Sequence, residues 1–371
     1  MIMPERFIHN HEGPVIEGMG TALPERIIDN DEIRARFERF DIDPFLKIAG
    51  IRQRRIIAPG QSASDLAVCA AESILSDSSI DRSKIDTLIC STLTADYRTP
   101  PTACVLQDRL GLSENICTFD LVQACPALIH EMAVIHGFFA TGISQNILVI
   151  HSDTLSQLIN PRDRELVPIH GDGATAILYR KNKTDGVEFE WFEFGTNGAQ
   201  AERVIVPEGM SRHPFTSDSL TETVSETGNI RSGVNLRIDG TAVFHFVIHT
   251  IPKFLQKACE RHKTSLSDYD IVLFHQANKL FLDMIYNMLR IPMPKRFYCL
   301  ESVGNISGAS LPFTLAEAVR KGRVFPGAKV LLCGFGAGLS WGAVSLRWQQ
   351  SPCATPPTAI LPGTGGKSEI T

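Results

Sequence analysis

Cys125 stands in the sequence where a nucleophile could act. An apolar stretch over 116–122 leads into a short loop, and a helical pattern begins immediately after the cysteine. Pro126 suits the first helical position, because the N–H that proline lacks would be unpaired there in any case. Unpaired amides and the positive end of a helix dipole favour a thiolate at such a place. A buried structural cysteine would fit the same pattern, so the local sequence leaves both interpretations open.

Two polar residues, His275 and Asn305, lie far from Cys125 in the chain but in comparable settings. His275, in IVLFHQANKLF, follows an apolar strand pattern directly, at the position where α/β sheets place functional groups. Asn305 lies in the Gly-Asn turn of VGNISGASLP. A structural histidine and a capping asparagine would explain each residue when it is considered alone.

The glycine-rich segment CGFGAGLSWGA, at 333–343, could be mistaken for a nucleotide loop. It contains GxGxG, which is not the six-residue dinucleotide fingerprint, and it comes too late for a first βαβ unit. The chain has no Gly-Lys-Ser/Thr phosphate loop either. A tight turn that presents backbone amides, as an oxyanion hole needs, agrees better with this segment.

The elements that would position these residues alternate in the manner of an α/β protein. Short apolar runs predict five buried strands, at 85–92, 147–153, 174–180, 270–276 and 329–336. Longer periodic segments predict five helices, at 64–77, 126–140, 242–261, 277–290 and 312–321.

Two short internal echoes indicate that the chain consists of two related halves. The segment 83–96 resembles 266–279: each has a polar turn, an Asp, a buried strand and then a loop into a helix. The segment 171–179 likewise resembles 336–346, where glycine-rich turns enter strand-like runs. Sequence and spacing therefore predict two halves that share one α/β plan.

The domain boundaries follow from composition. We expect the half that contains Cys125 to span 1–181 and the half that contains His275 and Asn305 to span 235–349. The segment 182–234 between them is polar and rich in turns, and we expect a connecting excursion over the active-site side, with a solvated linker as the alternative. The tail, 350–371, is rich in Pro, Gly and Thr and is predicted to be disordered.

The composition of the 371-residue chain excludes several classes of protein. Its net charge is −5 and its basic residues are scattered, which argues against nucleic acid as a partner. No run of 18 apolar residues and no secretory signal occurs, so neither a membrane span nor export is expected. The nine cysteines have no zinc-type spacing, which predicts a reduced, cytoplasmic protein without a metal site.

Several motifs, taken in order, resemble the β-ketoacyl-acyl carrier protein synthase III family of the thiolase superfamily. The resemblance covers most of 14–348 and rests on the cysteine segment together with GMGTALPERIIDNDEI, GIRQRR, TACVLQDRLGL, NPRDRELVPIHGDGATAIL, HQAN, GNISGAS and GFGAGLSWGA. It implies a thiolase fold, in which two pseudo-repeated βαβαβ-type halves form a layered αβαβα core. It also implies a homodimer that needs neither a metal nor a redox cofactor.

The resemblance also implies roles for particular residues. Cys125 matches the nucleophile that accepts an acyl group from a thioester, and His275 and Asn305 match the pair that assists decarboxylative condensation with a malonyl-type thioester. The backbone N–H groups of Cys125 and Ala337 match the oxyanion hole. The expected donors and acceptors are acyl-CoA or acyl-carrier-protein thioesters and a malonyl thioester.

Departures from the family pattern concern the substrate. The tryptophan and arginine that often hold the CoA adenine correspond here to Pro44 and Ile48, although Arg164 matches a second arginine on the CoA side. The arginine that helps to dock acyl carrier protein corresponds to Leu280. These differences weaken the expectation of coenzyme A recognition and favour secondary metabolism over primary fatty-acid initiation.

The acyl pocket is also expected to differ. Thr99 stands where an acetyl-selective relative has a phenylalanine, which predicts a primer longer or bulkier than acetyl. The glycines Gly336 and Gly338 are expected to contact substrate beside Ala337. Cys125-Pro126-Ala127 replaces the usual Cys-Ala-Gly and is expected to stiffen the turn of the nucleophile.

Three other functions remain compatible with the sequence. An acyltransferase of the same fold would pass the acyl group to oxygen, nitrogen or a second acyl thioester. A non-catalytic partner subunit of a condensing complex would act through its dimer surface, although such subunits usually lose the nucleophile or its partners. A cysteine hydrolase using Cys125 and His275 would release a free acid.

Overall fold

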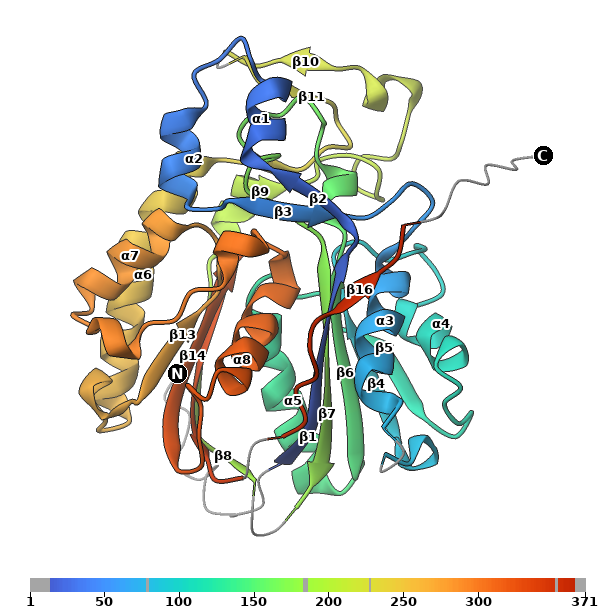
Figure 1. Cartoon of the computed structure of the whole chain (residues 1–371), viewed down its shortest axis with the longest axis vertical. Helices are drawn as coiled ribbons and strands as arrows, with labels where there is room; N and C mark the ends of the chain where they lie inside the picture. Colours follow the sequence, from blue (N-terminus) through green and yellow to red (C-terminus); the bar gives the residue numbers. More distant parts are fainter. Residues whose placement is uncertain (1–13, 78–79, 183–185, 227, 351–352, 364–371) are drawn as a thin grey trace.

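The computed structural model describes residues 14–77, 80–182, 186–226, 228–350 and 353–363, and shows five alternating layers of helices and sheets (Figure 1). The larger sheet has six strands, in the order β16 (Ala359–Leu361), β1 (Pro14–Pro24), β7 (Gly173–Lys181), β6 (Asn146–Asp153), β4 (Thr87–Ser91) and β5 (Cys117–Asp120). The smaller sheet has four, in the order β13 (Ile271–Phe274), β14 (Ala328–Gly336), β15 (Ser340–Trp348) and β8 (Val187–Thr196).

The two sheets repeat one pattern of strand pairing. In the larger sheet β4 pairs with β6 in parallel, and β6–β7 and β7–β1 are antiparallel. In the smaller sheet β13 pairs with β14 in parallel, and β14–β15 and β15–β8 are antiparallel. The two echoes in the sequence fall on corresponding strands, β4 with β13 and β7 with β15. The predicted repeat is confirmed.

Helices fill the space between the sheets and cover both outer faces (Figure 1). The middle layer contains α5 (Ala127–Thr141) and α8 (Ser310–Arg320). The outer layers contain α3 (Ala63–Leu75) and α4 (Thr102–Arg109) on one side and α6 (Gly240–Arg261) and α7 (Lys279–Met288) on the other. Within the described residues, none of the helices combines the length and apolar character that crossing a bilayer requires.

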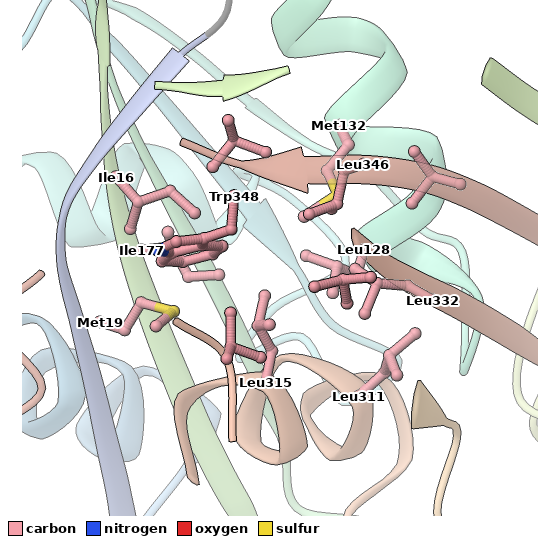
Figure 2. Packing of buried hydrophobic residues seen from close by; sticks show 14 of the residues in the cluster. Ile16, Met19, Leu128, Met132, Ile177, Leu311, Leu315, Leu332, Leu346 and Trp348 are labelled. Atoms are coloured by element: carbon pink, nitrogen blue, oxygen red, sulfur yellow. The ribbon is translucent and has the colours of Figure 1, made fainter. Parts of the chain in front are cut away.

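The central core explains why α5 and α8 are so apolar. Both helices pack between two sheets, and a helix enclosed in this way needs apolar residues around most of its circumference. Figure 2 shows side chains from both sheets and both helices in contact: Ile16, Met19, Leu128, Met132, Ile177, Leu311, Leu315, Leu332, Leu346 and Trp348. This core holds the start of α5, and with it Cys125, at a fixed depth between the sheets.

Small elements cover the end of the layers at which the predicted catalytic residues lie. They include α1 (Asn30–Arg36), α2 (Asp43–Ala49) and the paired strands β2 (Arg26–Asp29) and β3 (Gln53–Ile56). The others are the short strands β9 (Val204–Ile205), β10 (Thr223–Val224), β11 (Ile230–Arg231) and β12 (Arg237–Ile238).

Two boundaries differ from those expected from the sequence. The excursion expected over 182–234 begins only after β8, because VEFEWFEFGT alternates apolar and polar residues and completes the smaller sheet. The tail expected to be disordered contributes β16, which pairs in parallel with β1 through Ala22–Ala359 to Pro24–Leu361. The remaining parts of that tail, 351–352 and 364–371, and the N-terminal 1–13, lie outside the described residues.

A buried polar pair lies in the same core. The carboxylate of Glu131 on α5 and the Nε2 of His151 on β6 are 2.7 Å apart, and neither side chain is exposed to solvent. Neither atom makes a well-aligned hydrogen bond, so the contact is one of proximity. Because a buried polar group without a partner is costly, each of these groups depends on the other.

We expect His151→Leu to lower the free energy of unfolding by about 3–5 kcal/mol, because it leaves the Glu131 carboxylate buried without its partner. Urea denaturation at neutral pH measures the change. The double variant Glu131→Leu/His151→Leu removes both polar groups and should recover most of the loss. A single variant as stable as the unmodified protein would show that the pair contributes nothing.

Candidate active site

The three predicted catalytic residues lie in one cavity of about 250 Å³. Cys125 comes from the loop before α5, His275 from the end of β13, and Asn305 from the turn before α8. Gly336, the last residue of β14, and Ala337, which follows it, also line this cavity. Residues from both halves of the chain therefore meet at one site.

Cys125 is in direct contact with the glycine-rich end of β14. A Cβ atom added to Gly336 would lie 2.8 Å from both Cβ and Sγ of Cys125. One added to Gly334 would lie 2.6 Å from the Cα of Pro126. Glycine is required at these positions because the backbone of β14 approaches the nucleophile's turn so closely.

The environment of Cys125 favours the thiol over the thiolate. Burial, and next the nearby carboxylate of Asp153, raise the pKa of Cys125 to about 12, while a hydrogen bond with Ser307 acts in the opposite direction. The expectation that the start of α5 would favour a thiolate is wrong for this state of the site, because burial has the larger effect.

His275 presents a hydrogen-bond donor to the cavity. Burial, and next the neighbouring His170, lower the pKa of His275 to about 3, so its ring is neutral at physiological pH. Its Nδ1 is enclosed by protein and has no hydrogen-bond partner among the described residues. We assign the proton to Nε2, because a buried N–H without an acceptor would cost more than an unpaired lone pair, and Nε2 is the ring nitrogen left to face the cavity.

Asn305 presents a second donor. Its Oδ1 accepts hydrogen bonds from the backbone N–H of Ser307 at 2.9 Å and from the hydroxyl of Ser310 at 3.4 Å. These contacts fix the orientation of the amide and leave Nδ2 as a donor. The backbone of Asn305 is held by Ile169, whose carbonyl accepts its N–H at 2.9 Å.

The two amide side chains that follow His275, at Gln276 and Asn278, are structural. Gln276 donates to the carbonyl of Phe274 at 2.9 Å and accepts from the N–H of Cys299 at 3.1 Å. Asn278 caps α7 by accepting the N–H of Phe281 at 2.9 Å. These contacts account for both amides, and neither residue lines the cavity.

The turn that contains Ala337 is tied to the loop that contains Cys125. Ser340 donates its hydroxyl to the carbonyl of Ala337 at 2.7 Å and accepts from the side-chain amide of Gln123 at 3.0 Å. Gly338, at φ 130°, lies in a backbone region that favours glycine and is not among the residues that line the cavity. Its role here is the shape of the turn.

The two other residues predicted to bind substrate lie outside this cavity in the structure. Neither Arg164 nor Thr99 lines it. The guanidinium of Arg164 instead stacks over the ring of Phe40, with 4.1 Å between its Cζ and the ring centroid. The sequence correspondence identified matching positions but not their distance from the nucleophile.

Three residues of the site were missed in the sequence. Asp153 accepts the N–H groups of Leu93 at 2.7 Å and Gly308 at 2.9 Å, which joins β6 to the turn before α8. Ser307 lines the cavity with a φ of 52°, and His170 lines it as well. No spacing in the sequence marks these residues, because they become neighbours only through the pairing of distant segments.

Comparisons with known proteins agree with this arrangement. The family model described as 3-oxoacyl-[acyl-carrier-protein (ACP)] synthase III matches residues 119–198, and the model of its C-terminal part matches 259–348. A β-ketoacyl-[acyl-carrier-protein] synthase III of Rhodopirellula baltica is 34% identical over 358 residues, covering 91% of this chain and 99% of the relative. The chain belongs to the synthase III family.

Solved structures of related synthases have a fold similar to that of this chain. A 3-oxoacyl-(acyl-carrier protein) synthase from Burkholderia xenovorans LB400 has a TM-score of 0.84 at 27% identity, covering 94% of this chain and 97% of its own. The priming β-ketosynthase of the R1128 polyketide biosynthetic pathway has a TM-score of 0.78 at 26% identity, covering 95% and 99%. The chain has the thiolase fold of the synthase III family and is a condensing enzyme of that type.

We expect Gly336→Ala to slow the reaction of Cys125 with iodoacetamide by about 100-fold, since the new methyl group would displace the thiol. Peptide-resolved mass spectrometry follows Cys125 separately from the other cysteines. Gly137→Ala is the control: Gly137 lies on α5 with open space around its Cβ position. That variant should react normally and gain about 0.5–1 kcal/mol of stability. Equal rates in the two variants would contradict the close contact.

The raised pKa of Cys125 predicts an unusual pH dependence. Because only the thiolate reacts, the alkylation rate of Cys125 should rise about tenfold per pH unit from pH 7 to above pH 10. An ordinary thiol, whose pKa is about 8.5, levels off earlier. A rate that reaches its plateau below pH 9 would show that the thiol has a lower pKa than its burial indicates.

Proposed function

We propose that this synthase III transfers an acyl group to Cys125 and then joins it to a malonyl-type thioester by decarboxylative Claisen condensation. The observation that carries the proposal is the convergence of one thiol and two neutral side-chain donors on a largely apolar cavity. The donors are the N–H groups of Asn305 and His275. The hydrogen bond accepted by Oδ1 of Asn305 fixes the direction of its Nδ2–H, and the enclosed Nδ1 of His275 leaves Nε2 available to the cavity.

In the first step the sulfur of Cys125 attacks the carbonyl carbon of the acyl thioester, and the bond from that carbon to the departing sulfur breaks. The proton of Cys125 leaves with the released thiol, so the exchange needs no net acid or base. The backbone N–H groups of Cys125 and Ala337 are proposed to stabilise the oxyanion, because preorganised amides lower the barrier most where charge develops.

In the second step the malonyl thioester loses carbon dioxide, and negative charge accumulates on its thioester oxygen. The Nε2–H of His275 and the Nδ2–H of Asn305 are proposed to donate to that oxygen. The α-carbon then attacks the acyl carbonyl on Cys125, the bond from that carbon to the sulfur breaks, and the thiolate takes one proton from solvent water. Neutral donors suit this step, because they stabilise the enolate without holding the malonyl carboxylate as an ion pair.

The primer is proposed to be a mostly apolar acyl group longer than acetyl. Leucine, isoleucine, valine and phenylalanine side chains make up most of the cavity wall, which favours the burial of methylene groups. Acyl-CoA or acyl carrier protein is proposed as the carrier of the primer. The relative from the R1128 pathway is named as a priming enzyme of polyketide synthesis, which is compatible with a role in secondary metabolism.

A homodimer is proposed as the working form. Within the described residues, β5 is an edge strand of the larger sheet, and Val122, which follows it, is 69% exposed. Thr99 also lies in an exposed segment away from its own chain's cavity. An influence of Thr99 on primer length would therefore require a second copy of the chain.

Acylation and condensation can be tested separately. We expect Cys125→Ala to abolish the acyl adduct seen by intact mass spectrometry with C6–C12 acyl-CoA donors. Asn305→Ala should still form the adduct but should release carbon dioxide from malonyl thioester at least about 100-fold more slowly, since one transition-state donor is lost. Asn115→Ala, at an exposed asparagine outside the cavity, is the matched control for the loss of an amide.

Transfer to water, oxygen or nitrogen would give an acyl-enzyme that decays without release of carbon dioxide from the malonyl thioester. That result would replace condensation with one of the other acyl transfers. Activity confined to acetyl-CoA would contradict the longer primer.

A further inference from the structure

The cavity contains a second histidine that the proposed condensation does not use. His170 lines the cavity with only 5% of its surface exposed. It lies beside the reacting groups, because residues 170 and 305 are opposite each other in a short parallel bridge. The N–H of Gly171 donates to the carbonyl of Asn305 at 3.0 Å and fixes this alignment.

The hydrogen bonding of His170 determines which of its ring nitrogens carries the proton. Its Nδ1 lies 3.0 Å from the backbone carbonyl of Leu166, which can only accept, so Nδ1 must be the protonated nitrogen. Burial, above all, lowers the pKa of His170, so the ring is neutral and carries one proton. Nε2 is therefore an unprotonated acceptor that reaches the cavity, and among the described residues the hydrogen bond of this ring is the one at Nδ1.

The two histidines of the site thus have opposite hydrogen-bonding character. His275 has no acceptor at Nδ1 and presents Nε2–H as a donor, whereas Leu166 holds the Nδ1–H of His170 and leaves a lone pair on Nε2. Asn305 adds a donor, not an acceptor. His170 supplies an acceptor that neither the thioester oxygen nor a malonyl carboxylate can satisfy, since both of these are acceptors themselves.

The surroundings of His170 indicate which part of the substrate meets this acceptor. Leu166, its hydrogen-bond partner, belongs to a cluster of apolar side chains that forms one wall of the cavity, through Leu155, Leu158, Val204, Val206, Leu236 and Ile238. These side chains offer no polar group to a substrate. His170 therefore lies between the reacting centre and the part of the cavity suited to an acyl chain.

We propose that His170 selects acyl groups that carry a hydrogen-bond donor close to the thioester, such as a 3-hydroxyacyl chain. This inference rests on the proposed acylation of Cys125 and specifies its substrate class. A plain acyl chain that fills the cavity would cover this acceptor and leave it unpaired, whereas a hydroxyl placed within reach of Nε2 satisfies it. The acyl chain beyond the hydroxyl packs against the apolar wall.

The test is a competition between two donors that differ by one hydroxyl group, octanoyl-CoA and 3-hydroxyoctanoyl-CoA, with both enantiomers of the latter. Intact mass spectrometry measures the ratio of the two adducts on Cys125. We expect the unmodified protein to favour one hydroxyacyl enantiomer by roughly 3- to 10-fold, the value of one neutral hydrogen bond. His170→Phe should reverse the preference, with octanoyl transfer as fast as before or faster.

His170→Gln is the matched control, because its amide can donate to Leu166 and still offer an oxygen acceptor, and it should keep the preference for the hydroxyl. The proposal is overturned if the unmodified protein favours octanoyl-CoA or shows no preference. It is also overturned if His170→Phe slows both donors equally, which would assign His170 to the pantetheine arm or to structure.

Failure of the acylation step itself has a different signature, in which neither donor modifies Cys125. The preference can still be measured in that case, because Cys125→Ala protein binds the donors without reacting. Isothermal titration calorimetry should then give a dissociation constant for the favoured 3-hydroxyoctanoyl-CoA that is roughly 3- to 10-fold lower than that for octanoyl-CoA. Equal constants would overturn the role of His170 independently of any chemistry at the thiol.

Discussion

The site depends on the close contact between the glycine-rich end of β14 and the loop that holds Cys125. Gly334 and Gly336 allow the backbone of the second half to touch Cys125 and Pro126 of the first half, and no other residue has a side chain small enough. This contact sets the position of the Ala337 turn and closes one side of the cavity. His275 and Asn305 come into range because β13 pairs with the same strand and α8 packs against β13.

Burial then determines the chemistry available at this contact. The same desolvation that raises the pKa of the Cys125 thiol lowers that of the histidines, so each of these groups is neutral before substrate binds. A neutral site attracts thioesters through hydrogen bonds and apolar contact, and charge develops only as bonds change. The direction of each N–H group is set by neighbours such as Ser307 and Leu166, so these residues influence the reaction without bonding to the substrate.

The fold was largely predictable because its signals are local. Apolar runs and helical periods gave the central strands and helices, and the echoes gave the repeat. The strand Val187–Thr196 carried an alternating pattern that was overlooked among polar neighbours, whereas three residues of β16 carry too little pattern to be found. Cys125, His275 and Asn305 were predicted from the order of motifs along the chain, not from their surroundings, and the structure brings the three into one cavity. Arg164, which was predicted at the site, lies outside the cavity, and His170, which was not predicted, lines it. The distance of a residue from Cys125 depends on packing between segments far apart in the chain, which local patterns do not reveal.

The pairing of β16 with β1 has a consequence for the order of events during synthesis. Thr21 and Thr358, whose hydroxyls are 2.9 Å apart in the finished protein, are separated by 337 positions. At ribosomal rates of about 5–20 residues per second, β1 waits roughly twenty seconds to one minute before its last neighbour is made. During that interval a long apolar strand has one unpaired edge, which is where nascent chains associate wrongly. The newly made protein therefore keeps this edge open until nearly the end of synthesis, after Cys125, His275 and Asn305 have all been translated.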